Sequence, residues 1–474
     1  MPESREYDVV VIGAGPTGEN VADRAVKGGL SAVIVESELV GGDCSYWACM
    51  PSKALLRPVQ ALLGAQRVGG ARQAVTGGLD VEAVFERRDS FASRWDDAGQ
   101  VQWLEGAHVD LVRGQGRLAG PRRVEVATAA SGTVALTARH AVVVATGSAA
   151  ALPPVPGLAQ AKPWSPREAT SAKHVPGRLV VLGGGVVGCE MAQAFASLGS
   201  HVTVIEMADG LLPTNEPVAG QLVAQAMTES GIDVRTGQSA QSVEREGTGA
   251  VTVHLSAGEV LGDELLVAAG RRPRTEDIGL GTIGLAPGSW LDVDDTLAVR
   301  GVEGGWLYAA GDVNHRALLT HQGKYQARVC GDAIAARVKG DLDPSPWGKH
   351  SATADHGAVP QVIFTDPEVG AAGLTEAQAR RAGTNIRVVD YPLGDVAGAS
   401  LFADDYRGHA RLVVDEDRRV VIGATFVGPA AGELVHSATI AIVGEVPLER
   451  LWHAVPAYPT ISEVWLRLLE SYGL

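Results

Sequence analysis

The sequence of 474 residues has few cysteines and a deficit of positive charge. Four cysteines, at positions 44, 49, 189 and 330, are far too few for a disulfide-stapled secreted protein, whereas a close pair in an intracellular enzyme indicates redox or metal chemistry. The formal net charge of −15 argues against a nucleic-acid partner. Cys189 and Cys330 lack the spacing that would make a zinc site with the pair, so we expect both in the core and predict no metal site.

Long apolar segments are also missing. No stretch approaches the roughly 18 consecutive apolar residues that a membrane span requires. The N-terminal residues, MPESREYDVVVIG, lack a basic region followed by a long apolar run, so they do not match a signal peptide. We therefore expect a cytoplasmic protein with no membrane partner. At roughly 100–200 residues per domain, the length predicts two to four domains, each able to bury a core.

A glycine-rich turn near the N-terminus predicts a dinucleotide site. The apolar run 7–12 precedes the turn Gly13-Ala14-Gly15-Pro16-Thr17-Gly18, a helical pattern follows over 19–28, and a second apolar run, 32–35, ends at Glu36. Glycines at these positions let the backbone approach a pyrophosphate, which rests on the helix N-terminus. The acid about 20 residues beyond them can bond a ribose hydroxyl pair.

The same arrangement occurs a second time. A strand over 179–182 leads into a turn with Gly183, Gly185 and Gly188, then into a helix over 189–198 and a strand over 201–205 that ends at Glu206. Two such units predict two dinucleotides, and electron transfer between them is the simplest reason to have both. A carboxylate at Glu206 accepts from a 2′-hydroxyl and repels a 2′-phosphate, which favours NADH over NADPH. Two later arginines, at 271 and 272, are the cations that could oppose this preference.

The close cysteine pair lies directly after the first of these units, in the stretch GGDCSYWACMPSKALL over 41–56. Five helical residues rise about 7.5 Å, and a disulfide needs its Cα atoms within about 7 Å, so Cys44 and Cys49 can bridge only where the helix is distorted. Pro51 has no N–H for the Trp47 carbonyl, and we expect the helix to break there. The position predicts an easily reduced thiol pair held against a flavin.

Together with ATG at 145–147, AAGRRP at 268–273, AAGD at 309–312, FTDPEVGAAGLT at 364–375 and YPTISE at 458–463, these motifs span nearly the whole chain. They resemble the pyridine-nucleotide–disulfide oxidoreductases, the family of dihydrolipoamide dehydrogenase, glutathione reductase and mercuric reductase. The resemblance implies an α/β fold with two Rossmann-like domains and a C-terminal α+β dimerisation domain. It places the FAD domain at 1–150 and 276–347, the NAD(P) domain at 151–275 and the dimerisation domain at 348–474.

The resemblance also implies roles for individual residues. Cys49 would lie against the flavin, Cys44 would be the interchange thiol that meets substrate, and Lys53, paired with Glu190, would lie near the flavin N5 atom. The residues expected to hold FAD are Gly13, Gly15, Gly18, Glu36, Gly42, Lys53, Thr146, Gly147, Gly311 and Asp312. Those expected to hold NAD(P)H are Gly183, Gly185, Gly188, Glu206 and Gly270.

The sequence departs from this family at its C-terminal motif. Disulfide reductases of the family typically carry a histidine there, supplied by the partner subunit, whereas this chain has Tyr458, with Glu463 at the usual spacing of five. A phenol with a pKa of about 10 is a poor base at neutral pH and supplies no cation to lower the pKa of Cys44. Mercuric reductases and soluble transhydrogenases resemble the chain at this position. Mercuric reductases add a C-terminal cysteine pair, which this chain lacks. Soluble transhydrogenases lack the active cysteine pair, which this chain has.

A second departure is the pair Tyr46-Trp47 between the cysteines, which either stacks on a flat substrate or packs under the flavin. Our main hypothesis is an NADH-dependent FAD enzyme that reduces a disulfide. The alternative on the same scaffold is a quinone, a metal ion or another small acceptor, and a third hypothesis is a non-enzymatic redox sensor. Because Tyr458 and Glu463 would act across subunits, we expect a C₂ homodimer.

Overall fold

The computed structural model describes residues 3–129, 132–247 and 249–474. Contacts within the chain divide it into two compact units. The first unit contains Met1–Met50, Asp89–Ala149 and Arg271–His356, and the second contains Pro51–Arg88, Ala150–Gly270 and Gly357–Leu474. The domain bounds expected from the sequence stay a prediction.

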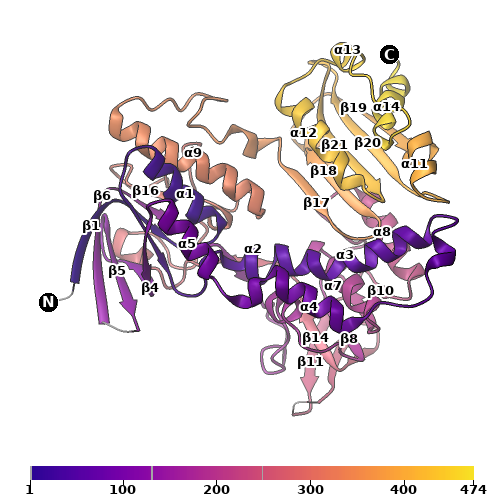
Figure 1. Ribbon diagram of the computed structural model, residues 1–474, viewed down its shortest axis with the longest axis horizontal. Coiled ribbons are helices and arrows are strands. Elements are labelled where there is room, and N and C mark those ends of the chain that lie inside the picture. The colour runs from indigo at the N-terminus through magenta and orange to yellow at the C-terminus, as the bar shows by residue number, and fades with distance from the viewer. Residues whose placement is uncertain (1–2, 130–131, 248) are drawn as a thin grey trace. The chain divides into compact units, whose positions relative to one another are not determined.

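A mixed sheet organises the first unit (Figure 1). Its strands lie in the order β3 (Asp110–Arg113), β2 (Ala32–Glu36), β1 (Glu3–Ile12), β6 (Gly132–Val144), β5 (Arg123–Thr128) and β4 (Gln115–Leu118), with β16 (Leu307–Ala309) also paired to β6. The pairs among β3, β2, β1, β6 and β16 are parallel, and β4 to β6 are antiparallel. The centre of β1, Val9 to Val11, is fully buried, as expected for a parallel strand covered on both faces.

Two helices of the first unit, α1 (Pro16–Lys27) and α9 (Thr320–Lys339), pack side by side (Figure 1). Small residues make the close approach possible: a Cβ atom on Gly323 would lie 2.3 Å from the Thr17 hydroxyl, and one on Gly331 would lie 2.5 Å from Arg24 Cβ. The other helices placed wholly in this unit are α2 (Gly42–Tyr46) and α5 (Ala98–Gly106). Because α1 follows the first glycine turn, this packing fixes α9 beside that turn.

The second unit contains a parallel sheet in the order β10 (Asp233–Arg235), β9 (His201–Ile205), β8 (Arg178–Leu182) and β14 (Glu264–Val267). Helices α7 (Val186–Ser197) and α8 (Pro217–Glu229) accompany it. A separate antiparallel sheet joins β11 (Ala240–Arg245), β12 (Val251–Leu255) and β13 (Glu259–Gly262). The strand–turn–helix–strand order that the sequence predicts twice is therefore present in both units.

The C-terminal part of the second unit is a five-stranded antiparallel sheet. Its order is β17 (Pro360–Ile363), β18 (Glu368–Gly373), β21 (Val420–Gly428), β20 (His409–Asp415) and β19 (Ile386–Pro392). Helices α12 (Val435–Val443) and α14 (Val464–Tyr472) pack on it. The predicted α+β character of this region is confirmed, and with it the predicted fold class.

The remaining elements are short apart from one long helix. α3 (Cys49–Gln66) runs from the cysteine pair out of the first unit into the second. The others are α4 (Val81–Phe91), α6 (Pro166–Thr170), α10 (Glu376–Arg381), α11 (Ala397–Phe402), α13 (Leu448–Leu451), β7 (Ser148–Ala150) and β15 (Arg271–Pro273). None of the helices in the described ranges combines the length and the apolarity that crossing a bilayer requires.

Candidate active site

The two glycine turns have the same geometry. Gly13 and Gly183 adopt φ angles of 103° and 110°, which are left-handed conformations that favour glycine. A Cβ atom on Gly18 would lie 1.9 Å from the Gly13 carbonyl oxygen, and one on Gly188 would lie 1.9 Å from that of Gly183. Each turn therefore needs a glycine at its first and last position, and the duplication inferred from the sequence extends to atomic detail.

The middle glycine of each turn lies at a helix N-terminus. Gly15 precedes α1 and Gly185 precedes α7, and neither helix has a side chain capping its first turn. A Cβ atom at either position would meet no protein atom within 4 Å. Main-chain N–H groups at an uncapped helix start, with open space in front of them, fit a pyrophosphate. Both turns can therefore hold the phosphates of a dinucleotide.

An acid is held in the same way beside each turn. Glu36 accepts hydrogen bonds from the amides of Ala14 and Glu38, both at 2.7 Å. Glu206 accepts from the amides of Gly184 and Ala208, at 2.6 and 2.7 Å. Each carboxylate oxygen has room for further hydrogen bonds, so both acids are oriented to accept from ribose hydroxyls.

Polar groups gather around Asp312 in the first unit. The Ser148 hydroxyl donates to Asp312 at 2.5 Å and accepts from Arg271 Nε at 2.6 Å, and Arg271 lies 3.6 Å from Asp312. Two residues before Ser148, the Thr146 hydroxyl is buried and has no hydrogen-bond partner in the described part of the chain. A buried hydroxyl without a partner fits a bound cofactor that supplies one. Sequence reasoning missed Ser148, although it directly follows the ATG motif.

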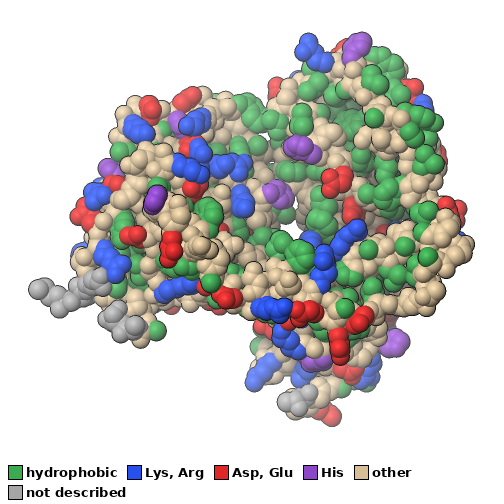
Figure 2. All heavy atoms as spheres, in the orientation of Figure 1, with side chains coloured by type: hydrophobic (Ala, Val, Ile, Leu, Met, Phe, Trp, Pro, Cys, Tyr) green, Lys and Arg blue, Asp and Glu red, His purple; other side chains and the backbone are tan. Residues whose placement is uncertain are grey.

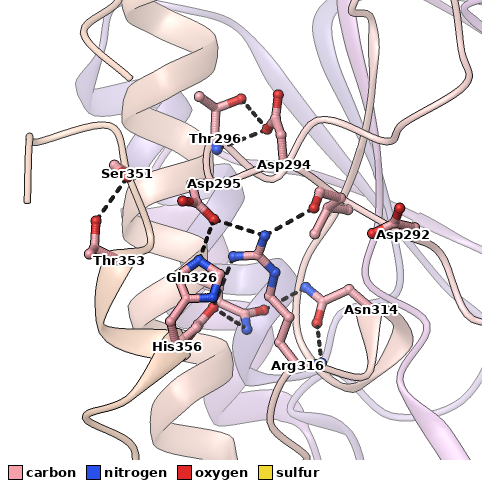
Figure 3. A network of polar contacts seen from close by, with 12 residues as sticks. Asp292, Asp294, Asp295, Thr296, Asn314, Arg316, Gln326, Ser351, Thr353 and His356 are labelled. Atoms are coloured by element: carbon pink, nitrogen blue, oxygen red, sulfur yellow. Dashed lines mark hydrogen bonds and ion pairs between the residues drawn. The ribbon is translucent and has the colours of Figure 1, made fainter. Parts of the chain in front are cut away.

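The turn that carries Asp312 is supported from α9 (Figure 3). The amide of Gly311 and the side chain of Asn314 both donate to Gln326 Oε1, at 2.8 Å. Gln326 in turn donates to the buried carboxylate of Asp355 at 2.9 Å. Beyond it, Arg316 bonds a second acid, Asp295, which also meets His356. The sequence offered no signal for this network, because its members are dispersed over 295–356.

The cysteine pair lies where two helices are interrupted, as the sequence predicts. α2 ends at Tyr46, α3 begins at Cys49, and the two residues between them are not helical. Cys49 Sγ lies 3.2 Å from the hydroxyl of Thr320, the first residue of α9. The hydrogen bond with Cys49 raises the pKa of the Cys44 thiol, as do burial and the charge of Cys49, while Thr320 and Lys324 act in the opposite direction. Burial and the contact with Cys49 therefore disfavour the thiolate form of Cys44.

Of the two aromatic residues between the cysteines, Tyr46 packs inside the protein. It is 1% exposed, its hydroxyl donates to the Val40 carbonyl at 2.8 Å, and its ring meets Trp47 edge-on at 5.7 Å. Trp95 donates to the Tyr46 carbonyl at 3.1 Å. We had expected Tyr46 and Trp47 either to stack on a flat substrate or to pack inside the protein. Tyr46 packs inside the protein, whereas Trp47 is half-buried.

Lys53 and Glu190 meet in the second unit, as the sequence predicts. Lys53 Nζ lies 2.6 Å from the Glu190 carboxylate, which also accepts from the amide of Phe364 at 2.9 Å. The ammonium lies 4.9 Å from the centroid of the Phe364 ring. Glu190 is buried, so removing its partner would leave an uncompensated charge.

Tyr458 and Glu463, the two site residues predicted in the C-terminal motif, differ in their exposure to solvent. Tyr458 is 75% exposed, whereas Glu463 is buried and bonds Arg467 at 2.6 Å. Leu401 and Val455 are also exposed in this part of the second unit, at 71% and 86%, and Figure 2 shows hydrophobic side chains over α12. Exposed apolar residues of this kind are typical of a surface that pairs with another chain. Within the described residues, no group of three or more His, Cys, Asp or Glu side chains could hold a metal ion.

Comparison with known proteins covers almost the whole chain. Residues 7–329 match the family model described as pyridine nucleotide-disulphide oxidoreductase, and residues 359–468 match its dimerisation domain. The dihydrolipoyl dehydrogenase of Thermus scotoductus is 32% identical, over 98% of this chain and 97% of that protein. A mercuric reductase of Staphylococcus aureus is 28% identical, over 97% of this chain and 81% of that protein. The Cu(II) complex of the HOCl-induced flavoprotein disulfide reductase RclA from Escherichia coli has the same fold, with a TM-score of 0.83, 24% identity, and 98% and 99% of the two chains covered.

Proposed function

The chain belongs to the pyridine nucleotide-disulphide oxidoreductases, a family of FAD-dependent enzymes, and we propose that it is an NADH-dependent reductase of a disulfide substrate. The observation that carries the proposal is the pair Cys44 and Cys49, which lies at the interruption between α2 and α3, in the same unit as the first dinucleotide turn. The overall reaction would convert NADH, a proton and one disulfide into NAD⁺ and two thiols.

The residues around the first turn would hold FAD. Gly15 and the α1 N-terminus would bind its pyrophosphate, Glu36 its adenosine ribose, and Asp312 its ribityl region. When bound, FAD accepts a hydride from NADH and passes an electron pair to a disulfide. The Lys53 ammonium, fixed by Glu190, would stabilise the negative charge of the reduced cofactor.

The cysteines would carry the electron pair to the substrate. As a thiolate, Cys44 attacks one sulfur of the substrate disulfide, forms a mixed disulfide and releases the first thiol. Cys49 then attacks Cys44 Sγ, closes the Cys44–Cys49 bridge and releases the second thiol. Cys49 would be the residue closer to the flavin, as the resemblance to the family implies.

Glu206 supports NADH as the electron donor. Its two oxygens are held by backbone amides beside the second turn, so a carboxylate would face the 2′ position of an adenosine ribose bound there. Arg272 is paired with Glu276 at 3.0 Å, and Arg271 bonds Ser148, so both arginines are already engaged.

We expect Glu206→Gln to reduce the preference for NADH over NADPH by tenfold to a hundredfold. A hydrogen bond to a charged group contributes about 1.5–3 kcal/mol, and the neutral amide no longer repels a 2′-phosphate. The measurement is kcat/KM for both nucleotides, with the melting temperature as the control for folding. A ratio that stays within twofold of the wild-type value would show that Glu206 does not face the 2′ position.

A homodimer would complete the site. The matched dimerisation domain supports self-association, and the exposed apolar residues Leu401 and Val455 supply surface for it. In this arrangement Tyr458 and Glu463 of one subunit would face the cysteine pair of the other. Sedimentation of the active enzyme as a monomer would contradict it.

A second candidate function keeps the cofactors and bypasses the dithiol. The raised pKa of Cys44 disfavours its thiolate, and Tyr458 brings no cation that would oppose this effect, so direct transfer from the flavin to a quinone or a metal ion is a specific alternative. An anaerobic titration with NADH separates the two. We expect a long-wavelength absorbance band and full reduction after two equivalents of NADH per flavin. Bleaching after one equivalent, without the band, would favour the quinone or the metal ion.

A further inference from the structure

An arginine of the first unit links two segments that flank the first glycine turn. The amide of Arg274 donates to the carbonyl of Gly147, at 3.0 Å, in the segment 145–147 that packs against Gly13. The guanidinium of Arg274 lies 3.4 Å from the carboxylate of Asp43 and 3.8 Å from that of Glu38. Arg274 therefore connects the segment after β6 with the start of α2 and the loop before it.

The start of α2 lies directly against the same turn. The amide of Gly41 donates to the carbonyl of Ala14 at 2.7 Å, and a Cβ atom on Gly42 would lie 2.8 Å from the Cα atom of Gly15. Asp43 is the next residue of the chain. Its carboxylate therefore belongs to the surroundings of the helix start at which the pyrophosphate of FAD would bind.

The second carboxylate lies toward the adenosine end of the same site. The amide of Glu38 donates at 2.7 Å to Glu36, the acid that would bind the adenosine ribose. Glu38 and Asp43 thus bring two negative charges to a site for an anion, although the helix N-terminus there attracts negative charge. Like charges repel one another, so the site needs a cation near these two acids, and Arg274 supplies it.

The ion pairs of Arg274 are weaker than others in the same unit. Its nitrogen–oxygen distances are 3.4 and 3.8 Å, whereas Arg113 meets Asp97 at 2.6 Å, and its side chain is 34% exposed. Partly exposed ion pairs of this kind stabilise a fold little. Both hydrogen bonds to Asp43 come from Nη2, and a guanidinium has five N–H donors whose planar arrangement matches a phosphate. Arg274 is therefore suited to a further acceptor.

We propose that Arg274 binds the pyrophosphate of FAD and that Asp43 and Glu38 position its guanidinium, an inference that rests on the cofactor site proposed above. The uncapped N-terminus of α1 offers main-chain donors, and Arg274 adds a full positive charge to them. The two carboxylates keep the guanidinium at the site, and it offsets their repulsion of the phosphates.

The first experiment measures how long the holoenzyme retains its cofactor. Release of FAD after dilution is followed by flavin fluorescence, and circular dichroism records the fold. We expect Arg274→Met to accelerate release about tenfold to a hundredfold, the range for losing a hydrogen bond to a charged group. Arg274→Lys keeps the charge without the planar donor set and should give an intermediate rate. Arg272→Met removes a nearby arginine that is paired with Glu276, and this matched control should release FAD like the wild type.

Replacing the partner carboxylate separates cofactor binding from a purely structural ion pair. If Arg274 only stabilised the fold through Asp43, Asp43→Asn would be as harmful as Arg274→Met, and the double variant would be no better than either. In our proposal, Asp43 repels the pyrophosphate once its partner is missing. We therefore expect Asp43→Asn alone to have the smaller effect, and the double variant to release FAD severalfold more slowly than Arg274→Met.

Phosphorus NMR of the holoenzyme locates the contact on the cofactor. The two phosphorus atoms of bound FAD report the charge around the pyrophosphate, and the spectra are recorded with excess FAD so that each variant is loaded. We expect Arg274→Met to shift at least one of the two resonances of the bound cofactor. Arg272→Met should shift neither.

Three results would each overturn the proposal: release of FAD from Arg274→Met within twofold of the wild-type rate, phosphorus resonances that Arg274→Met leaves unchanged, or a double variant no better than Arg274→Met. With a flavin-loaded wild type, any of them would remove Arg274 from the site and leave the site itself standing. A folded wild-type protein that binds no FAD would instead overturn the proposed cofactor site, and the role of Arg274 with it.

Discussion

Replacing Cys44 by serine should abolish disulfide reduction and leave reduction of the bound flavin by NADH intact. Serine cannot form the mixed disulfide, and loss of a covalent nucleophile typically lowers turnover by roughly a thousandfold or more. The proposed hydride step would use the nucleotide sites and the Lys53–Glu190 pair, none of which contains Cys44. Stopped-flow absorbance of the flavin and steady-state thiol release, measured on the same preparation, test the two halves of this prediction.

Cys189→Ser is the matched control for this experiment. Cys189 is buried, and its thiol donates to the Gly184 carbonyl at 3.3 Å, a hydrogen bond that a serine hydroxyl can replace. We expect this variant to retain disulfide turnover. Survival of turnover in Cys44→Ser would refute the dithiol mechanism. Full quinone activity in a variant with both Cys44 and Cys49 replaced by serine would favour direct flavin chemistry instead.

Gly185→Val should eliminate reduction by NADH without loosening the fold. Gly185 has φ −77° and ψ −171°, a conformation that any residue adopts, and a Cβ atom there meets no protein atom within 4 Å. Valine in place of an N-terminal helix glycine costs about 1 kcal/mol or less. Its methyl groups would fill the space in front of the α7 N-terminus, where we propose that the pyrophosphate of NADH binds. We expect NADH-dependent flavin reduction to fall at least roughly a hundredfold, because several charge-assisted hydrogen bonds are lost together.

The duplicated turn provides the paired variant. Gly15→Val fills the equivalent space before α1 and should yield a folded protein that purifies without FAD. Gly185→Val should keep its FAD and be reduced normally by dithionite. Flavin content, dithionite reduction and melting temperature are the measurements. An enzyme with Gly185→Val that binds NADH normally would show that the second turn is not the nucleotide site.

The features that the sequence predicted correctly are local or carried by a motif. Gly13 and Gly183 each specify a tight turn through their own backbone conformation, and Glu36 and Glu206 follow at a fixed spacing because strand and helix lengths are similar in both units. The interruption before Cys49 follows from a proline two residues later. Such features depend on neighbours along the chain, which the sequence displays directly.

The features that it did not predict depend on contacts between distant segments. Gln326 bonds the Gly311 amide across 15 residues, and Ser148 meets Asp312 across 164. Neither partner carries a pattern of its own, since a glutamine in a helix or a serine after a strand is common. Glu19 was assigned only to a helical pattern, because a buried acid without a partner among the described residues becomes visible only in the folded chain.

The two turns are alike, yet the segments that face them are not. The first turn is faced by Ala145-Thr146-Gly147, in which the Thr146 hydroxyl is buried and has no hydrogen-bond partner among the described residues. Ser148 follows and donates a hydrogen bond to Asp312. The second is met by Ala268-Ala269-Gly270, which offers no side-chain donor at the position of Thr146. A dinucleotide in the first site would be contacted along its whole length and would stay bound. A dinucleotide in the second site would be held mainly by its adenosine end. That asymmetry is what a catalytic cycle needs when one dinucleotide stays and the other must leave after every turnover.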